Sequence, residues 1–424
     1  MNKSAKAVVA AASIDATRSA PSASASSSPT IAAIREFHED LIEIRRDFHA
    51  HPELGFEEVR TARIVAEQLR ALSIETHTGI GKTGVVGVVR GRPSKGHRPS
   101  KRTIGLRADM DALPIVENNT FSHRSSHPHR MHACGHDGHT TMLLGAARYL
   151  ADTRNFDGAV HLIFQPGEEG HAGAKAMIDD GLFTRFPCDA VYAMHNWPSL
   201  PAGTIGINVG PMMAAADRFE IVIRGRGGHG AHPYLAIDPV VIAGHLITAV
   251  QSIVARNVSP IDSAVVTIAA MHAGDLDAFS VIPNEVRLIG TARSFKESVQ
   301  LMLERRLVEL TQSIAAAFGA TASCTYHRLY PATINTPAEA RFAADVAESL
   351  VGADHVVRDL APSMGAEDFS FMLQVRPGAY LRLGQGGAES GMFLHNTRYD
   401  FNDEVLPYGA GLFAALVERA MPRA

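Results

Sequence analysis

Apolar residues spaced three and four positions apart predict the first helices of the chain. This spacing is followed by Ile31, Ile34, Phe37, Leu41, Ile44 and Phe48, which would share one face of a helix. A second helix is predicted over residues 57–72. Short apolar runs typical of buried strands then alternate with helical segments, with strands over 85–90, 103–108, 159–164 and 190–194 and helices over 140–150 and 174–180. This alternation predicts an α/β layer with a largely parallel sheet.

The pattern changes after residue 212. Segments now follow the order β-α-β-β-α-β, over residues 219–224, 239–256, 264–270, 285–291, 298–318 and 322–327. This order is the split-βαβ or ferredoxin-like arrangement. Helices and a strand then return, over 338–350, 369–373, 379–383 and 406–420. We therefore expect an α/β domain formed by residues 31–212 and 329–424, interrupted by a smaller inserted domain over 213–328.

Residues 1–30 are predicted to form a disordered tail. Ala, Ser, Thr and Pro dominate this stretch, which has no periodic apolar face with which to build a core. A cleaved signal peptide is the alternative, because Lys3 and Lys6 precede an apolar run over 7–12. That run is shorter than the usual apolar region of a signal peptide and is followed by Asp15, which favours the tail.

Composition narrows the class of protein. A chain of 424 residues that is 46% hydrophobic and 20% charged is typical of a globular protein with two or three domains. Lys and Arg total 40 against 44 Asp and Glu, and this net charge of −4 argues against a nucleic-acid partner. No uninterrupted apolar stretch reaches the roughly 18 residues of a membrane span. Three scattered cysteines cannot form a disulfide framework, which favours a reducing compartment and a cytoplasmic location.

The segment from Gly79 to Gly84 matches the pattern G-x-G-x-x-G but lacks its context. Dinucleotide binding requires these glycines to follow a strand and open a helix, whereas here they lead into the apolar run over 85–89. The segment also resembles the end of a P-loop, but Thr76 occupies the position of that motif's first glycine. A glycine-rich turn before a strand is therefore predicted.

Side chains that can bind metal ions gather at or near the ends of predicted strands, with Cys134 and His136 just before the helix over 140–150 and His395 in a loop after the strand over 379–383. They are Asp109, Cys134, His136, Glu168, Glu169, His195 and His395. Because ligands of open α/β sheets bind at the carboxyl ends of the strands, we expect these side chains to share one crevice. A single Glu–Glu pair is usually a solvated turn, and a single buried histidine is usually a hydrogen-bonded core residue. Their coincidence at several strand ends of one domain favours a metal site.

Thiolate, imidazole and carboxylate groups together are ligands of borderline divalent metals such as zinc, cobalt or manganese. The set is too large for one closed tetrahedral site and suits two ions about 3.5–4 Å apart. A carboxylate that is not a ligand can accept the proton of a water molecule that such ions acidify. The adjacent Glu168 and Glu169 supply one residue for each task. A histidine-rich metal-handling protein is the alternative, and it would hold its ligands in the loop 123–139 alone.

A series of short motifs covers the chain from about residue 38 to 408. They are RRDFHAHPELG (45–55), RADMDALP (107–114), MHACGHDGH (131–139), QPGEEG (165–170), MHNWP (194–198), GGH (227–229), VIP (281–283), GAEDF (365–369) and LHN (394–396). With these motifs the chain resembles the M20 metallopeptidase/amidohydrolase family. The resemblance is to the branch that holds hippurate hydrolases, N-acyl-amino-acid amidohydrolases and indole-acetyl-amino-acid hydrolases.

The resemblance implies a two-metal, aminopeptidase-like catalytic domain and an inserted lid that also dimerises. By motif position, the metal ligands would be Cys134, His136, Glu169, His195 and His395. Glu168 would be the general acid/base, and Asp109 would orient a metal ligand from behind. His229 would reach the active site of the other subunit and stabilise the oxyanion.

Two further positions concern the substrate. Arg293 would bind the α-carboxylate of the substrate, since the guanidinium fork suits bidentate carboxylate binding. Relatives usually have Asn immediately before the VIP motif, where this chain has Ser280. A hydroxyl is shorter than an amide and offers one donor instead of two, so we expect the substrate to be held differently here.

The expected function is that of a metal-dependent amidohydrolase. It would cleave the amide bond of N-acyl amino acids, such as hippurate and N-acetyl or indole-acetyl conjugates, to a carboxylic acid and a free amino acid. We expect two divalent ions per subunit (Mn, Zn or Co), no nucleic-acid or membrane partner, and a homodimer or homotetramer. The alternatives are a dipeptidase or carboxypeptidase, an N-acetyl-diaminopimelate deacetylase, and a non-catalytic metal-binding relative. The presence of Glu168 argues against the last, because a binding protein needs no base.

Overall fold

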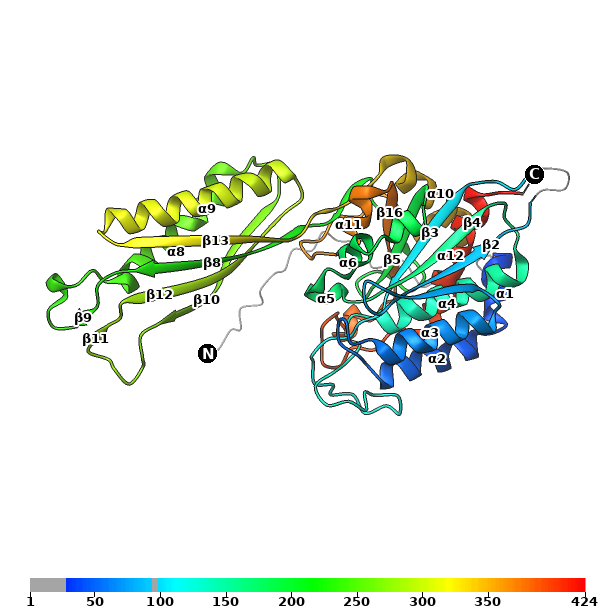
Figure 1. Ribbon diagram of the computed structural model, residues 1–424, viewed down its shortest axis with the longest axis horizontal. Coiled ribbons are helices and arrows are strands. Elements are labelled where there is room, and N and C mark those ends of the chain that lie inside the picture. Colours follow the sequence, from blue (N-terminus) through cyan, green and yellow to red (C-terminus); the bar gives the residue numbers. More distant parts are fainter. Residues whose placement is uncertain (1–27, 94–97, 424) are drawn as a thin grey trace, which may run out of the picture.

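The computed structural model describes residues 28–93 and 98–423 and has two lobes. The larger lobe, here called the body, is built on an eight-stranded sheet, and the smaller lobe, the lid, on a four-stranded sheet that extends to one side (Figure 1). The chain enters the lid at β8 (Ala215–Arg224) and leaves it at β13 (Thr321–Tyr330). Beside these crossings, β7 (Gly210–Met213) pairs with β14 (Thr333–Asn335).

The body sheet is mixed and has parallel strands at its centre. Its spatial order is β1 (Glu75–Ile80), β2 (Gly84–Arg90), β4 (Ala159–Gln165), β3 (Thr103–Asp109), β5 (Ala190–Trp197), β16 (Gly378–Gly384), β6 (Ile205–Gly206) and β15 (Val356–Val357). The four strands from β4 to β16 are parallel to one another, so their carboxyl ends lie at one edge. β1 and β2 add an antiparallel hairpin, and its turn is the glycine-rich segment 79–84.

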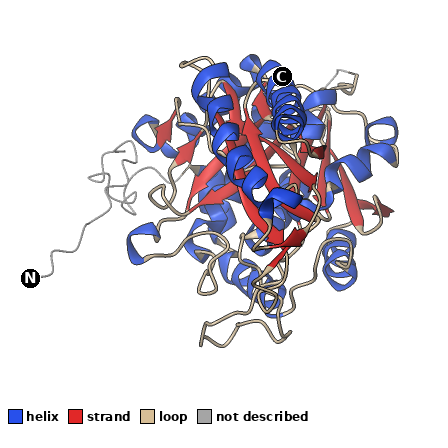
Figure 2. Ribbon diagram, turned by 90° about the vertical axis from the view of Figure 1, so that its left-hand side faces the viewer, coloured by secondary structure: helices blue, strands red, loops and turns tan. Residues whose placement is uncertain are grey.

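Helices cover both faces of the body sheet (Figure 2). One face is covered by α1 (Pro29–Arg35), α2 (His38–Ala50), α3 (Val59–Ala71), α4 (His136–Thr153), α10 (Pro337–Val351) and α12 (Leu406–Ala420). The other face is covered by α6 (Gly173–Asp179), α7 (Leu182–Arg185) and α11 (Ser370–Val375). Alternate residues of β2 supply the two cores, since Val85 and Val89 belong to the first and Val86 and Val88 to the second.

The lid has the predicted β-α-β-β-α-β order. Its sheet is antiparallel, and its strands in sequence order are β8, β10 (Ala264–Ala273), β12 (Glu285–Ser294) and β13. In space they lie in the order β10-β12-β8-β13, which is the ferredoxin-like arrangement. Helices α8 (Pro239–Asn257) and α9 (Glu297–Ala317) pack together against the sheet. The expectation of an α/β fold with a ferredoxin-like insertion is confirmed.

One helix of the described residues, α8, is long and apolar enough to cross a membrane by length and composition alone. Its buried side chains include Ile242, Leu246, Val250 and Ile253, which pack in the lid core. These positions follow the spacing of a core-facing helix stripe.

Three expectations need correction in detail. The predicted helix through Ile31 and Phe48 is two helices, α1 and α2, because α1 packs on α12 while α2 packs on α4. The strand β1 was missed, because this edge strand is mostly polar and partly exposed. Pro29 and Thr30 begin α1 and do not belong to the tail predicted over 1–30. The rest of the predicted tail, 1–27, lies outside the described residues.

Candidate metal centre

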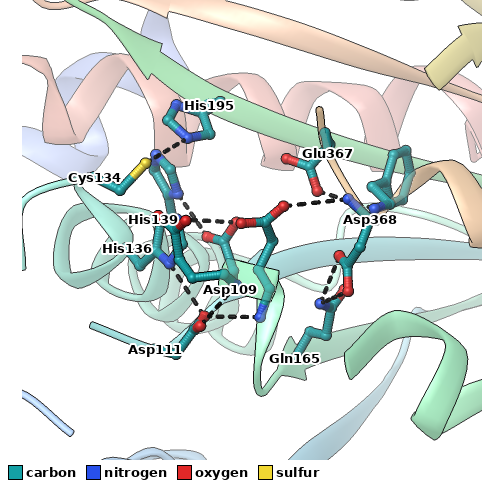
Figure 3. Close-up of polar contacts among 12 residues, drawn as sticks. Asp109, Asp111, Cys134, His136, His139, Gln165, His195, Glu367 and Asp368 are labelled. Atoms are coloured by element: carbon teal, nitrogen blue, oxygen red, sulfur yellow. Dashed lines mark hydrogen bonds and ion pairs between the residues drawn. The ribbon is translucent and has the colours of Figure 1, made fainter. Parts of the chain in front are cut away.

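The predicted metal-binding side chains meet at the carboxyl edge of the central parallel strands. Figure 3 shows four of them, Asp109, Cys134, His136 and His195. Asp109 is the last residue of β3, and His195 lies near the end of β5. Glu168 and Glu169 follow closely on the end of β4. His136 is the first residue of α4. Parallel strands put their carboxyl ends at one edge, which is why segments far apart in sequence converge here.

Gly135 makes the turn between Cys134 and His136. Its φ of 95° lies in the left-handed region, which favours glycine. A Cβ at this position would lie 2.4 Å from Asn196 Oδ1 and 2.6 Å from the Tyr399 hydroxyl. Only glycine therefore lets the chain pass this point without displacing its neighbours.

Two groups of donor atoms share the Cys134 thiol. One consists of Cys134, His136 and His195, and the other of Cys134, Glu169 and His395; within each group the donor atoms lie within 4.8 Å of one another. The Cys134 Sγ lies 3.4 Å from His195 Nε2. The Glu169 carboxylate lies 3.2 Å from His395 Nε2. All five side chains expected to be ligands are thus brought together.

These residues fit a divalent metal. His136 Nε2 is buried and has no hydrogen-bond partner among the described residues, as expected of an atom that faces a cation. Burial, together with the carboxylates of Glu169 and Glu168, raises the pKa of the Cys134 thiol well above its usual value. A metal ion would reverse this effect, because the thiolate is the ligand form of cysteine. Sulfur, nitrogen and oxygen donors together suit zinc and its neighbours among the transition metals.

His395 reaches the site from a loop and not from a strand end. Its φ of 62° is unusual for a residue other than glycine. The backbone is held there by a hydrogen bond of 2.7 Å from the His395 N–H to the Ala133 carbonyl, next to Cys134. Such a backbone conformation costs about 1–3 kcal/mol and persists where the surroundings impose it, often at functional sites.

Asp111 ties the metal-binding side chains to the glutamate segment. Its carboxylate accepts the backbone N–H groups of Glu168 and Glu169 at 3.0 and 2.9 Å and lies 3.2 Å from His136 Nδ1. Asp111 therefore fixes the ring of a predicted ligand, the role expected of Asp109. In the sequence, Asp111 could have been found from its position two residues after Asp109 in the same motif.

Asp109 instead lies closest to His139. Its Oδ1 lies 2.6 Å from His139 Nδ1, and its Oδ2 lies 3.6 Å from His136 Nε2. His139 was not singled out, although it follows His136 by three residues and so shares its helix face. Its other ring nitrogen lies 2.7 Å from Asn196 Oδ1. The loop histidines 123, 127 and 129 belong to no donor group among the described residues, which counts against the loop-only alternative.

A buried arginine balances the charge beneath the site. Arg107 forms ion pairs with Asp109 at 2.8 Å, Asp368 at 2.9 Å and Glu367 at 3.0 Å, and all four side chains are buried. Burial alone would raise the pKa of Asp109, but Arg107, with two histidines, holds it well below its usual range. Asp109 is therefore an anion in the folded protein.

The pKa of Glu168 is shifted in the opposite direction to that of Asp109. Burial, together with the carboxylates of Glu367 and Glu169, raises the pKa of Glu168 well above its usual value. Its Oε1 accepts the backbone N–H of Asp368 at 3.2 Å. A carboxyl group with a raised pKa holds a proton more readily, which suits a residue that must both accept and return one in general acid–base catalysis.

A cavity of about 520 Å³ opens from the metal-binding residues toward the lid. Its apolar lining comes mainly from Trp197, Met213, Leu329, Tyr380 and Leu394. Arg293 of β12 also lines it, and its guanidinium donates to Thr291 Oγ1 at 2.7 Å. The lid thus brings one cation to a largely apolar chamber, which can accommodate a small molecule with an apolar part and an anionic group.

His229 and Ser280 lie elsewhere. His229 is in the short strand β9 (Gly228–His229), which pairs with β11 (Val281–Ile282) at the end of the lid farthest from the body (Figure 1). The Ser280 carbonyl accepts the Gly230 N–H at 2.7 Å, so the two residues are neighbours. Both are exposed, and neither is among the described residues that line the cavity. Within one chain, the structure does not bring them to the metal-binding residues.

Comparison with known proteins connects this site to one family. The family model of peptidase family M20/M25/M40 matches residues 105–419. A hippurate hydrolase of Campylobacter jejuni is 42% identical over 386 residues, which cover 91% of this chain and 98% of that protein. The Arabidopsis thaliana IAA-amino acid hydrolase ILR1-like 4 is 38% identical over 397 residues, covering 92% and 88%. The solved structure of the Bacillus subtilis YXEP protein, a dinuclear metal binding peptidase from the M20 family, superposes with a TM-score of 0.77 at 33% identity, covering 91% and 99%.

Proposed function

Since the chain belongs to peptidase family M20/M25/M40 and is a metal-dependent amide hydrolase, we propose that its substrates are N-acyl amino acids. The products would be a carboxylic acid and a free amino acid. One observation carries the proposal: the buried Glu168 and four of the five donor side chains, all but His136, line a cavity to which the lid contributes Arg293. An apolar chamber with one cation suits an acyl group joined to an amino acid that carries a carboxylate.

The residues that would hold two divalent ions are Cys134, His136, Glu169, His195 and His395. We propose manganese, zinc or cobalt, because these metals accept mixed thiolate, imidazole and carboxylate ligands. Bound ions would supply the Lewis acidity that lowers the pKa of water toward about 7 and polarises the amide carbonyl. Asp111 keeps His136 in one orientation, and Asp109 does the same for His139.

The chain's own groups then handle the protons and the substrate. Glu168 accepts a proton from water as the water attacks the amide carbonyl, and it returns a proton to the amine that leaves. Arg293 binds the α-carboxylate with its guanidinium fork. Trp197 and its apolar neighbours surround the acyl group and exclude water from the reacting bond.

We also propose a homodimer in which His229 of one subunit stabilises the oxyanion in the other. His229 and Ser280 are exposed at the lid end, and a second chain is the means by which they would reach a site. The apolar side chains of Leu276, Phe279 and Val281 are exposed in the same region, as a protein–protein contact requires. A variant lacking Glu168 and one lacking His229, each inactive alone, should regain activity when subunits exchange. No recovery after proven exchange would contradict the role of His229. We place the enzyme in the cytoplasm on its cysteine usage.

The test is release of free amino acid by the purified protein. The panel should hold acetyl, benzoyl and indole-acetyl amino acids and dipeptides, assayed after chelation and after return of Mn²⁺, Co²⁺ or Zn²⁺. We expect metal-dependent release from the acyl amino acids. Release from dipeptides alone would indicate a dipeptidase, and no release with any metal would contradict the proposal.

Glu168→Gln is the matching variant. We expect its kcat to fall by about 10²–10⁴-fold while its metal content stays that of the wild type. Glu67→Gln is the control, since Glu67 is exposed and pairs only with Arg63 one helix turn away among the described contacts. Near-normal turnover by Glu168→Gln would show that another group moves the proton.

A further inference from the structure

Tyr330 lies at the point where the chain returns from the lid to the body. It is the last residue of β13 and pairs with Ala216, next to the start of β8. The register shifts between Arg328 and Tyr330, so Leu329 is an extra residue in the strand. Such bulges re-aim the side chains that follow them and recur beside active sites. Sequence reasoning gave no reason to single out Tyr330.

The Tyr330 hydroxyl is hydrogen-bonded to the segment that carries Glu168. It donates to the Glu168 carbonyl at 2.5 Å and accepts the Ala172 N–H at 3.1 Å. The side chain is almost fully buried. One hydroxyl group of the lid strand therefore contacts both ends of the segment 168–172, which contains the proposed general base.

That segment has an irregular backbone. Gly170 and Ala172 have φ values of 82° and 56°, and Glu169 is not helical although it lies within the short helix α5 (Glu168–His171). At its start, Asp111 accepts the N–H groups of Glu168 and Glu169. These contacts hold the N–H groups from the body, whereas Tyr330 holds the Glu168 carbonyl from the lid.

Tyr330 also borders two cavities. It lines the 520 Å³ cavity at the metal-binding residues and a second cavity of about 620 Å³ between the lid and α11. Its ring meets that of Phe371 edge-on, with centroids 6.0 Å apart. The second cavity is lined by residues of both lobes, so the ring borders free space where the lid meets the body. A rotation of the lid would move Tyr330 toward or away from that space.

We propose that Tyr330 is a positioning residue that couples the position of the lid to the placement of Glu168. With the lid as it lies in this structure, the Tyr330 hydroxyl holds the carbonyl of Glu168 and the N–H of Ala172 by hydrogen bonds. When the lid rotates, the Tyr330 hydroxyl loses these two hydrogen bonds and the backbone of the segment 168–172 becomes more mobile. The role of Glu168 in turnover rests on the proposed function, whereas the restraint on the segment does not.

The test compares Tyr330→Phe with Tyr326→Phe. Tyr326 lies on the same strand, and its hydroxyl donates to Asp217 Oδ2 at 2.6 Å inside the lid, so its loss removes a comparable hydrogen bond away from Glu168. Both changes keep the ring. The first readout is hydrogen–deuterium exchange of peptides that cover residues 168–173, with metal content measured on the same samples.

In Tyr330→Phe we expect exchange in this segment to rise by at least tenfold, with the wild-type metal content. We expect kcat on the preferred substrate to fall about 10–100-fold with KM changed less than threefold, since a displaced catalytic group costs about this much in rate. In Tyr326→Phe neither quantity should change. Wild-type exchange in Tyr330→Phe, or an equal rise in both variants, would overturn the proposal. If the wild type hydrolyses no N-acyl amino acid, the proposed function fails, while the exchange measurement still decides whether Tyr330 restrains the segment.

Discussion

Replacing Gly135 by alanine tests the geometry of the candidate metal centre directly. The new methyl group would lie 2.4 Å from Asn196 Oδ1 and 2.6 Å from the Tyr399 hydroxyl, and Gly135 already has a φ of 95°. A left-handed alanine costs about 1–2 kcal/mol, and overpacking a filled site costs about 1–3 kcal/mol more. We expect the free energy of unfolding to fall by about 2–5 kcal/mol, because both costs apply. The displaced chain carries Cys134 and His136, so metal binding should weaken as well.

Gly181→Ala is a matched control for the backbone cost. Gly181 is also the residue before a helix, with φ 86° and ψ 25° against 95° and 15° at Gly135. The heavy atom nearest to its added Cβ is Arg185 Cδ at 4.0 Å, so alanine meets no obstacle there. We expect this variant to lose only the backbone cost of about 1–2 kcal/mol and to keep its metal.

The assays are urea unfolding of both metal-free variants and metal content by mass spectrometry after reconstitution. The difference between the two variants isolates the packing at Asn196 and Tyr399. Equal unfolding free energies, together with wild-type metal content in Gly135→Ala, would show that the turn has room to adjust and would refute the reasoning.

The remaining predictions concern charge and ligation. Arg107→Met should lower the free energy of unfolding by about 3–5 kcal/mol, measured in urea, because it leaves three buried carboxylates without their common cation; a loss below 1 kcal/mol would contradict this. Burial raises the pKa of Glu58 from 4.5 to about 7, so the wild type should lose stability as pH rises between these values, and Glu58→Gln should not. Between pH 4 and pH 8, the free energy of unfolding of Glu58→Gln should rise by up to about 3 kcal/mol relative to that of the wild type. No change in this difference would show that the pKa of Glu58 is unshifted. Cys134→Ala should bind less metal; full stoichiometry by mass spectrometry would exclude the thiol as a ligand.

The sequence predicts the outline of the site because its parts lie at strand ends. A buried strand followed by a metal-binding side chain is visible in the pattern, as at Asp109 and at His195, and the parallel topology then brings these ends together. His395 lies on a loop after β16, so the pattern indicated it less directly than Asp109 or His195, and its motif supported it. The ferredoxin-like lid was predictable because its helices and strands are long and amphipathic.

Other features depend on contacts that a linear pattern does not contain. The edge strand β1 is mostly polar, so its own periodicity does not predict a strand. Its pairing with β2 makes it one. Asp111 and Tyr330 act through hydrogen bonds to backbone groups of a distant segment, and backbone groups carry no residue-type signal. Whether His229 reaches an active site depends on a second chain and not on the fold of one.

The pairing of β7 with β14 has a consequence for the order in which the chain folds. Met213 lies opposite Thr333 in this pairing, so the two parts of the body meet across a connection that spans residues 214–332. Closing an unstructured loop of that length costs about 4 kcal/mol in chain entropy. The lid removes most of that cost, because its own first and last strands are paired, with Ala216 opposite Tyr330. Once the lid has folded, its paired ends hold the two halves of the body at contact distance. The folded lid therefore lowers the entropy cost of completing the body sheet.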